Sequence, residues 1–178
     1  MSLIDKEMDE EMYHETTILT RRHLTDEVLR VPLLHVKAPQ AICVQPSEEL
    51  QNVVVTMREQ RTGAVLIMDA QNSKKVVGIF TERDLLLRVA GRGWDFHQHK
   101  IGEVMTPNPK CLTPQDKIGF ALNMMVSQGY RHIPVLSPGK PPVMLSVRDL
   151  LTFLCEHFPE DVMNLPPEPQ IPSERDGG

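Results

Sequence analysis

Apolar residues along the first half of the chain follow two patterns, one with helical period and one of short unbroken runs. Leu50, Val53 and Met57 recur at the spacing of one helix face, which predicts an amphipathic helix. Continuous apolar runs on either side of a polar turn predict strands. The expected order is strand, helix, strand, strand, helix. The corresponding ranges are 41–45, 48–60, 64–68, 76–80 and 82–90.

The same order returns in the second half, because the chain contains an internal repeat. Ile42-Cys43-Val44-Gln45-Pro46 aligns with Lys110-Cys111-Leu112-Thr113-Pro114, and Thr81-Glu82-Arg83-Asp84 aligns with Ser146-Val147-Arg148-Asp149. The shift falls from 68 positions to 65, since the loop between the later strands is shorter in the second copy. Thr113, Pro114 and Asp116 are typical of a helix start. The second set of ranges is 110–112, 114–127, 132–136, 142–146 and 147–157.

The repeat predicts an α/β (α+β) fold of two β-α-β-β-α units, each a small sheet with helices packed on one face. The ends of the chain differ from this pattern. Residues 4–30 are expected to form an amphipathic helix that ends before Pro32, and the proline-rich end is expected to be disordered. The predicted parts are an N-terminal extension, two repeats and a tail. Their ranges are 1–32, 33–95, 96–158 and 159–178.

Composition and charge exclude several classes of protein. The net charge of −5 over 178 residues argues against a nucleic acid as the main partner. No apolar run approaches the length that crosses a membrane, and the acidic N-terminus is unlike a signal peptide. Cys43, Cys111 and Cys155 form no CxxC pair, which favours a reducing cytoplasmic location. We expect these cysteines to be buried or incidental.

The candidate chemistry lies in Thr81-x-Arg83-Asp84 and Ser146-x-Arg148-Asp149, each between a strand and a helix. One interpretation is a capping box that only starts the helix. The other is a nucleotide site, because a helix N-terminus and an arginine attract phosphate while a carboxylate accepts from ribose hydroxyls. The residues alone leave both interpretations open, although the second gains from the duplication.

These motifs resemble those of a known family. Val77-Gly78-Ile79-Phe80-Thr81-Glu82-Arg83-Asp84-Leu85, Tyr130-Arg131-His132-Ile133-Pro134-Val135-Leu136 and Val104-Met105-Thr106-Pro107 are similar to segments of CBS (cystathionine β-synthase-type) domains. The resemblance is to a tandem CBS pair, or Bateman module, and covers roughly 33–157. It implies two domains packed sheet to sheet about a pseudo-twofold axis, with two clefts between them, and pairing into a homodimer.

The resemblance also implies a ligand and its contacts. AMP, ADP and ATP are the leading candidates, ahead of S-adenosylmethionine and NAD-type molecules, and no cofactor is required. Asp84 and Asp149 would hold ribose, and Thr81 and Ser146 would face phosphate. The remaining expected contacts are Arg83, Arg148, Arg131 and His132 near phosphate, Thr106 and Pro107 near adenine, and Gly63, Ala64, Val65 and Lys37 along the clefts.

The two copies depart from each other at three places. Ala38 aligns with Thr106, Val143 aligns with Gly78, and Arg131-His132 aligns with Gly63-Ala64. A hydroxyl, a small residue and a pair of cations are therefore each present in one copy only. We expect two unequal clefts, one strong and the other weak or empty.

Several functions remain open at this stage. The leading prediction is a sensor that binds an adenosine nucleotide and signals to an unidentified protein partner by conformational change. The alternatives are a ligand-free dimerisation scaffold and a detached regulatory subunit of a metabolic enzyme or transporter. No nucleophile elbow, Walker loop, GxGxxG or HExxH motif favours an enzyme, so no catalytic residue is predicted. His97 and His99 are interpreted as a solvated pair, so no metal site is predicted.

Overall fold

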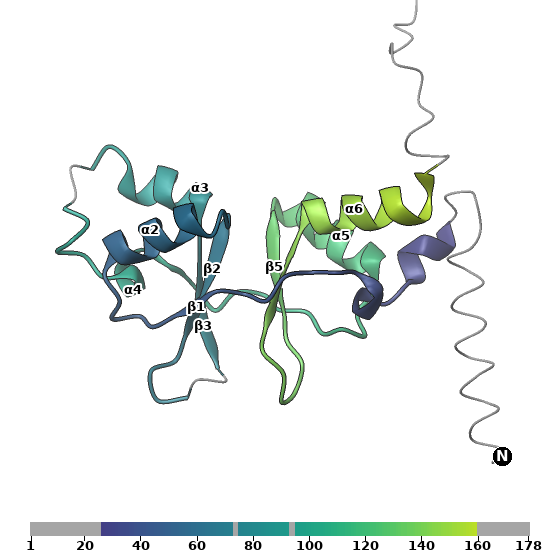
Figure 1. Ribbon diagram of the computed structural model, residues 1–178, viewed down its shortest axis with the longest axis horizontal. Coiled ribbons are helices and arrows are strands. Elements are labelled where there is room, and N and C mark those ends of the chain that lie inside the picture. Colours follow the sequence, from purple (N-terminus) through teal and green to yellow (C-terminus); the bar gives the residue numbers. More distant parts are fainter. Residues whose placement is uncertain (1–25, 73–74, 93–94, 160–178) are drawn as a thin grey trace, which may run out of the picture.

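The computed structural model describes residues 26–72, 75–92 and 95–159, which form two α/β units side by side (Figure 1). The first unit contains a sheet with helices on one side. Its elements are β1 (Cys43–Val44), α2 (Leu50–Glu59), β2 (Ala64–Met68), β3 (Val76–Thr81), α3 (Glu82–Asp84), a π-helix (Leu85–Val89), α4 (Ile101–Val104) and β4 (Thr106–Pro107).

The second unit is built from a smaller sheet and two longer helices. Its elements are α5 (Ile118–Gln128), β5 (His132–Val135), β6 (Val143–Ser146) and α6 (Val147–His157). Two short 3₁₀ helices, Asp26–Arg30 and Leu33–His35, come first in the described chain and pack on this unit. None of the described helices has the length and apolar character needed to cross a bilayer.

The sheets face each other, as the resemblance to a tandem CBS pair implies. In the first unit the strand order is β1-β2-β3-β4, and in the second unit β5 pairs with β6. All five residues of β2 are buried, because its two faces pack on different partners. Val65 and Ile67 join the core under the helices, while Leu66 packs in a cluster with Met144 of β6. This second face packs sheet against sheet, and the predicted fold class is confirmed.

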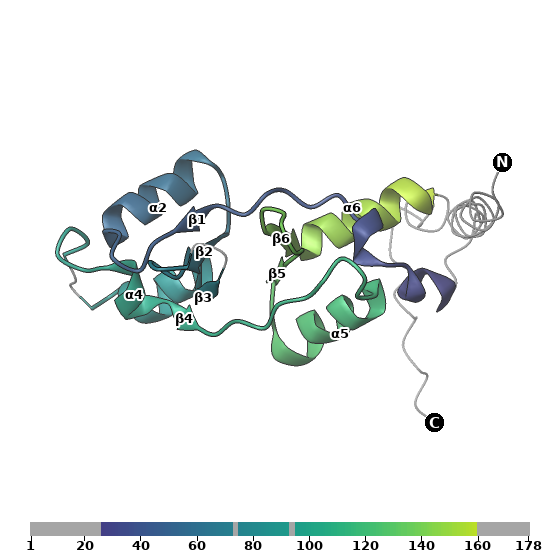
Figure 2. The same ribbon diagram turned by 90° about the horizontal axis from the view of Figure 1, so that it is seen from below.

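Two linking segments cross between the units (Figure 2). The segment ahead of β1 pairs with β6, because Ala41 N–H donates to the carbonyl of Pro142 over 2.9 Å and Met144 N–H donates to that of Pro39 over 3.0 Å. The segment after α4 forms β4 and pairs with β3 in the first sheet. The boundaries predicted from the repeat stay a prediction, and packing crosses them.

The buried side chains show the same crossing. Val28 and Val31, which precede the first repeat, lie in the core of the second unit. Ile101 and Val104, which begin the second repeat, lie in the core of the first unit. Each unit is therefore completed by a segment that sequence order assigns elsewhere, which fixes the two units against each other.

Several expected elements are shorter or begin later. No strand forms at 110–112, where Leu112 makes a single bridge to Val135. The helix expected from 114 begins at Ile118. Thr113 donates to the carboxylate of Asp116 through N–H and hydroxyl over 2.6 and 2.9 Å, so this motif closes a turn ahead of the helix.

Three further expectations concern single segments. The helix expected over 82–90 is one α-turn followed by the π-helix, in which Ala90 N–H donates to the Leu85 carbonyl. Of the helix expected over 4–30, only Asp26–Arg30 is described, and it is a 3₁₀ helix. The remainder, like most of the proline-rich tail, lies outside the described residues. Cys43, one of the three cysteines expected to be buried or incidental, is exposed.

Candidate functional site

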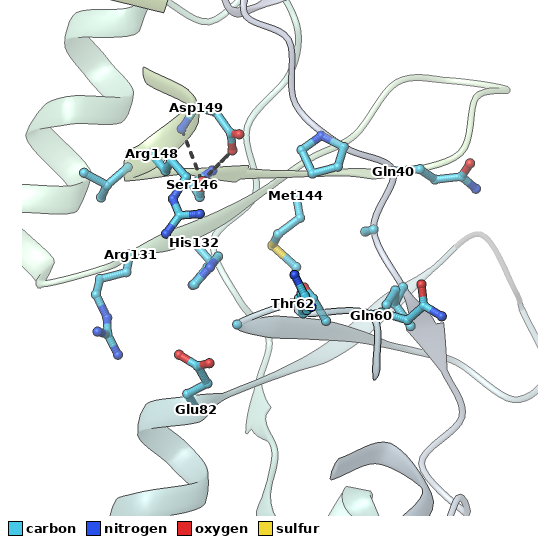
Figure 3. Close-up of a pocket in the computed structure, with 16 residues that line it drawn as sticks. Gln40, Gln60, Thr62, Glu82, Arg131, His132, Met144, Ser146, Arg148 and Asp149 are labelled. Carbon is cyan, nitrogen blue, oxygen red and sulfur yellow. Dashed lines mark hydrogen bonds between the residues drawn. The ribbon is translucent and has the colours of Figure 1, made fainter. Parts of the chain in front are cut away.

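Two clefts lie between the units. The larger has a volume of about 590 Å³ and is lined by the end of α2, the segment ahead of β1, and the β5 and β6 strands (Figure 3). The smaller has a volume of about 190 Å³ and is lined by β3, α3, β4 and the segment ahead of β5. Small-molecule sites are commonly 300–1,000 Å³, and only the larger cleft falls in this range.

Ser146 and Asp149 lie in the larger cleft at the start of α6. The Ser146 N–H and hydroxyl donate to Oδ2 of Asp149 over 2.7 and 2.6 Å, and the Asp149 N–H returns a bond to the hydroxyl. The capping interpretation is therefore correct for this motif. It uses only one carboxylate oxygen, since within the described chain Oδ1 of Asp149 accepts no hydrogen bond.

Three arginines line the larger cleft: Arg61, Arg131 and Arg148. None of them forms an ion pair or side-chain hydrogen bond with the described residues. They come from different segments, Arg61 from the first unit and the other two from the second. A cleft with three uncommitted guanidiniums is suited to an anion with several oxygen atoms, because each guanidinium donates in a planar fork.

Sequence reasoning missed Arg61. Its backbone has φ 50°, a left-handed conformation that few non-glycine residues adopt. Its repeat counterpart is Gly129, which has φ 67° after the end of α5. The alignment of an arginine with a glycine just beyond a helix was the signal available in the sequence, because glycine is the usual residue there.

His132 lies at the meeting of the two clefts and lines both. Burial lowers the pKa of its imidazole and the charge of Arg131 lowers it further, while Glu82 and Asp149 act in the opposite direction. Gly63 faces the ring, and a Cβ at that position would come within 2.8 Å of Cε1. The absence of a side chain at Gly63 therefore makes room for the imidazole.

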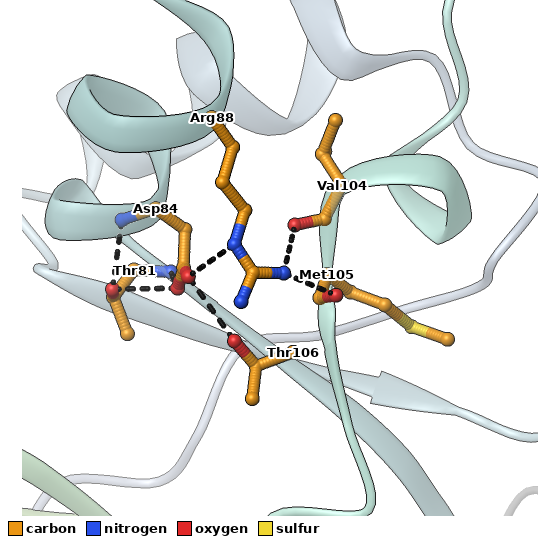
Figure 4. A network of polar contacts seen from close by, with 6 residues as sticks. All are labelled: Thr81, Asp84, Arg88, Val104, Met105 and Thr106. Atoms are coloured by element: carbon orange, nitrogen blue, oxygen red, sulfur yellow. Dashed lines mark hydrogen bonds and ion pairs between the residues drawn. The ribbon is translucent and has the colours of Figure 1, made fainter.

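The Asp84 network, which we define as Thr81, Asp84, Arg88 and Thr106, borders the smaller cleft (Figure 4). All of its members except Arg88 line that cleft. Thr81 donates its N–H and hydroxyl to Oδ2 of Asp84 over 3.0 and 2.7 Å. The Thr106 hydroxyl donates to Oδ1 over 3.1 Å, and Nε of Arg88 forms an ion pair with the same oxygen over 3.3 Å. Both carboxylate oxygens are occupied. Arg83 is also committed, since it donates to the Gly129 carbonyl over 2.8 Å.

The structure brings most of the expected site residues to the two clefts. The larger cleft holds Gly63, Arg131, His132, Ser146, Arg148 and Asp149, and the smaller holds Thr81, Arg83, Asp84 and Thr106 together with Arg131 and His132. Their contact with a ligand remains a prediction. Glu82 in the larger cleft and Arg88 in the Asp84 network were not anticipated.

Four expected residues line neither cleft. Ala64 and Val65 are buried in the middle of β2. Pro107 is an exposed residue of β4 that pairs with Gly78. Lys37 is exposed and its Nζ lies 3.7 Å from a carboxylate oxygen of Glu156. Apolar runs and motif positions identify a segment of the site, but they do not tell which of its side chains face the cleft.

The fold and the clefts together define a tandem pair of small α/β domains with sites between them. The family model of the CBS domain matches residues 35–91 and 101–156, and the chain belongs to this family.

Known proteins agree with this assignment. An uncharacterized 17.7 kDa protein of Acidianus ambivalens is 32% identical over 114 residues, which is 64% of this chain and 66% of that protein. The CBS-domain protein ATU1752 of Agrobacterium tumefaciens has a crystal structure 26% identical in sequence, with a TM-score of 0.62 over 74% of this chain and 98% of that one. The CBS domain protein PAE2072 of Pyrobaculum aerophilum, complexed with AMP, shares the fold at 21% identity with a TM-score of 0.61 over 71% of this chain and 97% of that one.

Proposed function

We propose that this chain is a regulatory module that binds an adenine nucleotide in the larger cleft. The observation that carries the proposal is Oδ1 of Asp149, which accepts no hydrogen bond from the described residues and shares the cleft with three arginines whose side chains are likewise unpaired among those residues. A carboxylate that keeps one oxygen free can accept from a ribose hydroxyl, and guanidiniums pair with phosphate. The AMP complex of the Pyrobaculum protein supports the same class of ligand.

The remaining wall of the larger cleft suits a purine base. Ala41, Ile42 and Met144 line one part of it, and Ala41 and Met144 are buried within the inter-sheet cluster. An apolar wall favours a planar aromatic ring. Base, ribose and phosphate would then contact different parts of one cleft.

The position of the cleft gives the ligand a way to act on the protein. Arg61 and Glu82 belong to the first unit, whereas Arg131 and Asp149 belong to the second. A ligand that contacts both units stabilises the arrangement in which it makes the most contacts, by the difference between its affinities for the two arrangements. We propose this change as the regulatory signal, transmitted to a protein partner without chemical conversion of the nucleotide.

Homodimerisation is part of the proposal. Leu86 and Leu87 of the π-helix and Leu151 of α6 are 68%, 72% and 54% exposed. Large apolar side chains of this exposure on the surface helices of both units favour association. Replacing Leu86 and Leu87 by serine should convert a dimer to a monomer in analytical ultracentrifugation. An unchanged sedimentation coefficient would show that another surface, or none, forms the dimer.

The test of the ligand is titration calorimetry with AMP, ADP, ATP, NADH and S-adenosylmethionine. Asp149→Ala should weaken binding by about 100-fold, since two hydrogen bonds to a charged group contribute roughly 3 kcal/mol. The matched variant Asp84→Ala should bind within about threefold of the original chain, because no ligand group is expected to reach that carboxylate. Melting curves establish that both variants fold.

The result also separates the alternatives. A nucleotide recovered unchanged after prolonged incubation supports a sensor, whereas turnover would indicate an enzyme. No heat and no shift of melting temperature with any of the five compounds would overturn the proposal in favour of a ligand-free scaffold.

A further inference from the structure

We infer that Arg88 and Thr106 close the smaller cleft by occupying the carboxylate of Asp84, so that each chain holds one nucleotide rather than two. This inference rests on the proposed function, because it takes the carboxylate of the Thr/Ser-x-Arg-Asp motif as the group that accepts from ribose. The side chains of Arg88 and Thr106 would then explain why the two copies of the motif bind a nucleotide differently.

The acceptor capacity of Asp84 is already used. A carboxylate has two oxygens and about four lone-pair directions. Thr81 donates two hydrogen bonds to Oδ2 and Thr106 donates one to Oδ1, while the Arg88 guanidinium forms an ion pair with Oδ1. A ribose hydroxyl at Oδ1 would have to compete with the Thr106 hydroxyl and the Arg88 guanidinium, which both lie against that oxygen. In a cleft of about 190 Å³ the displaced side chain has little room beside a ligand.

The second repeat lacks both donors. The counterpart of Arg88 at the shift of 65 is Phe153, which is buried in the core of the second unit and stacks on His157. Thr106 pairs with Ile79, and the residue bonded to the corresponding Met144 is Pro39. Pro39 has neither a hydroxyl nor an N–H, and the neighbouring Ala38 has no polar side chain. Oδ1 of Asp149 stays open for these reasons.

The pairing register also corrects the simple alignment. Sequence alignment places Ala38 opposite Thr106, whereas the hydrogen bond from Met144 N–H to Pro39 places Pro39 there. Pro39 lines the larger cleft, and Ala38 packs on the core of the second unit. The difference between the clefts therefore arises at two positions. Arg88 and Thr106 carry donor groups beside Asp84, whereas their counterparts beside Asp149, Phe153 and Pro39, carry none.

Arg88 binds more than the carboxylate. Its Nη1 donates to the carbonyls of Val104 and Met105 over 3.2 and 2.9 Å (Figure 4). One guanidinium thus joins Asp84 to the segment that leads into β4, and the Thr106 hydroxyl makes the same connection from the other side. Opening the smaller cleft requires that these bonds break together, because they share one side chain and one short segment.

The experiment is calorimetry with ATP and AMP on the double variant Arg88→Met/Thr106→Val. Methionine keeps much of the arginine stem and valine keeps the branched shape of threonine, so both donors are lost with little change of volume. We expect the stoichiometry to rise from one nucleotide per chain to two. Adding Asp84→Ala to the double variant should return it to one, which assigns the new site to the smaller cleft.

Two further variants separate closure from general effects of charge. Arg88→Lys keeps a cation near Asp84 and should keep the stoichiometry at one. Arg58→Met removes an exposed arginine of α2 that lines neither cleft, and it should behave as the original chain. Amide hydrogen exchange at Val104, Met105 and Thr106 should accelerate in the double variant and not in Arg58→Met.

The outcomes distinguish this inference from the proposed function. If the original chain binds one nucleotide and the folded double variant also binds one, closure by Arg88 and Thr106 is wrong while the proposed function stands. If the original chain binds none and the double variant binds one, the proposed function is wrong while closure stands. Binding of two nucleotides by the original chain overturns the inference directly, and binding by neither protein overturns both.

Discussion

The two clefts contain the same motif, but its carboxylate and arginine form more hydrogen bonds and ion pairs with other residues in the smaller cleft than in the larger one. Asp84 accepts hydrogen bonds from Thr81 and Thr106 and forms an ion pair with Arg88, whereas among the described residues Asp149 accepts only from Ser146. The arginines differ in the same direction, since Arg83 donates to a backbone carbonyl and Arg148 has no partner in the described chain. The motif starts a helix in both places. Its neighbours decide whether any polar group is left for a ligand.

The comparison has a physical basis in the cost of desolvation. A ligand gains little from a polar group whose hydrogen bonds must first be broken, because the new bonds only replace the old ones. An exposed, uncommitted group exchanges water for ligand at a smaller cost. Similar sequence at two positions therefore does not predict similar binding.

The largest effect that would test the comparison is expected for Gly63→Ala. The added Cβ would press on the imidazole of His132, and crowding of this kind costs about 1–3 kcal/mol of the free energy of unfolding. Nucleotide binding in the larger cleft should weaken because the ring must move. Chemical denaturation and calorimetry measure the two effects. The double variant Gly63→Ala/His132→Ala should recover stability, and a wild-type melting curve for Gly63→Ala alone would contradict the contact.

A second pair of variants separates capping from binding. Ser146→Ala and Thr81→Ala each remove the cap of a helix, so each should lower the free energy of unfolding by about 1 kcal/mol. Only Ser146→Ala should also weaken nucleotide binding, because the proposed ligand site is the larger cleft. Equal losses of affinity in both variants would show that the clefts are equivalent after all.

A smaller effect is expected at Arg61. Arg61→Gly removes one guanidinium and places glycine at φ 50°, a conformation that glycine adopts without strain. Affinity for ATP should fall about fivefold, since an exposed charge pair contributes up to about 1 kcal/mol, while the melting temperature should not fall. The control is Arg58→Ala, which removes a neighbouring arginine that lines neither cleft. Alanine is used because glycine would destabilise the interior of α2. A loss of stability without loss of ATP affinity would assign Arg61 to the helix end alone.

The smallest effect concerns pH. Because the pKa of His132 is lowered, the imidazole is neutral in the free protein near pH 7. A bound phosphate would raise that pKa, so binding takes up a proton and affinity should increase as the pH falls from 7 to 6, by less than about tenfold per unit. Calorimetry in buffers of different ionisation enthalpy reports the proton directly. His132→Gln should remove the dependence, and a pH-independent original chain would exclude His132 from the site.

Folding stability should also depend on His132, but it should decrease as the pH falls, whereas the affinity for nucleotide should increase. A histidine whose folded pKa lies below its unfolded value of about 6.5 opposes folding once the unfolded chain becomes protonated. In the absence of ligand, stability is therefore lost as the pH falls from about 6.5 towards the lowered folded pKa. His132→Gln should lose less stability over this interval in urea unfolding.

Much of the fold was predictable from the sequence, because its signals are local. Helical spacing in Leu50, Val53 and Met57 and the buried run of β2 identify their elements directly. The prediction was wrong where one pattern suits both a turn and a helix cap. Thr113 and Asp116 have the pattern of a helix cap, but they close a turn, and the helix starts at Ile118. Short motifs shared by turns and caps do not distinguish them.

The sequence by itself determined the duplicated unit, the family and the segments that border the two clefts, since repeats and strand–helix junctions are recorded in the order of residues. Only the tertiary structure decided which cleft has room and which carboxylate is open. Arg88, Thr106 and Pro39 lie far from one another along the chain, and their effect depends on which strand each linking segment joins. Whether a carboxylate is already hydrogen-bonded depends on how close the donors lie in space. The two crossing linkers set the distances between these donors and the carboxylates.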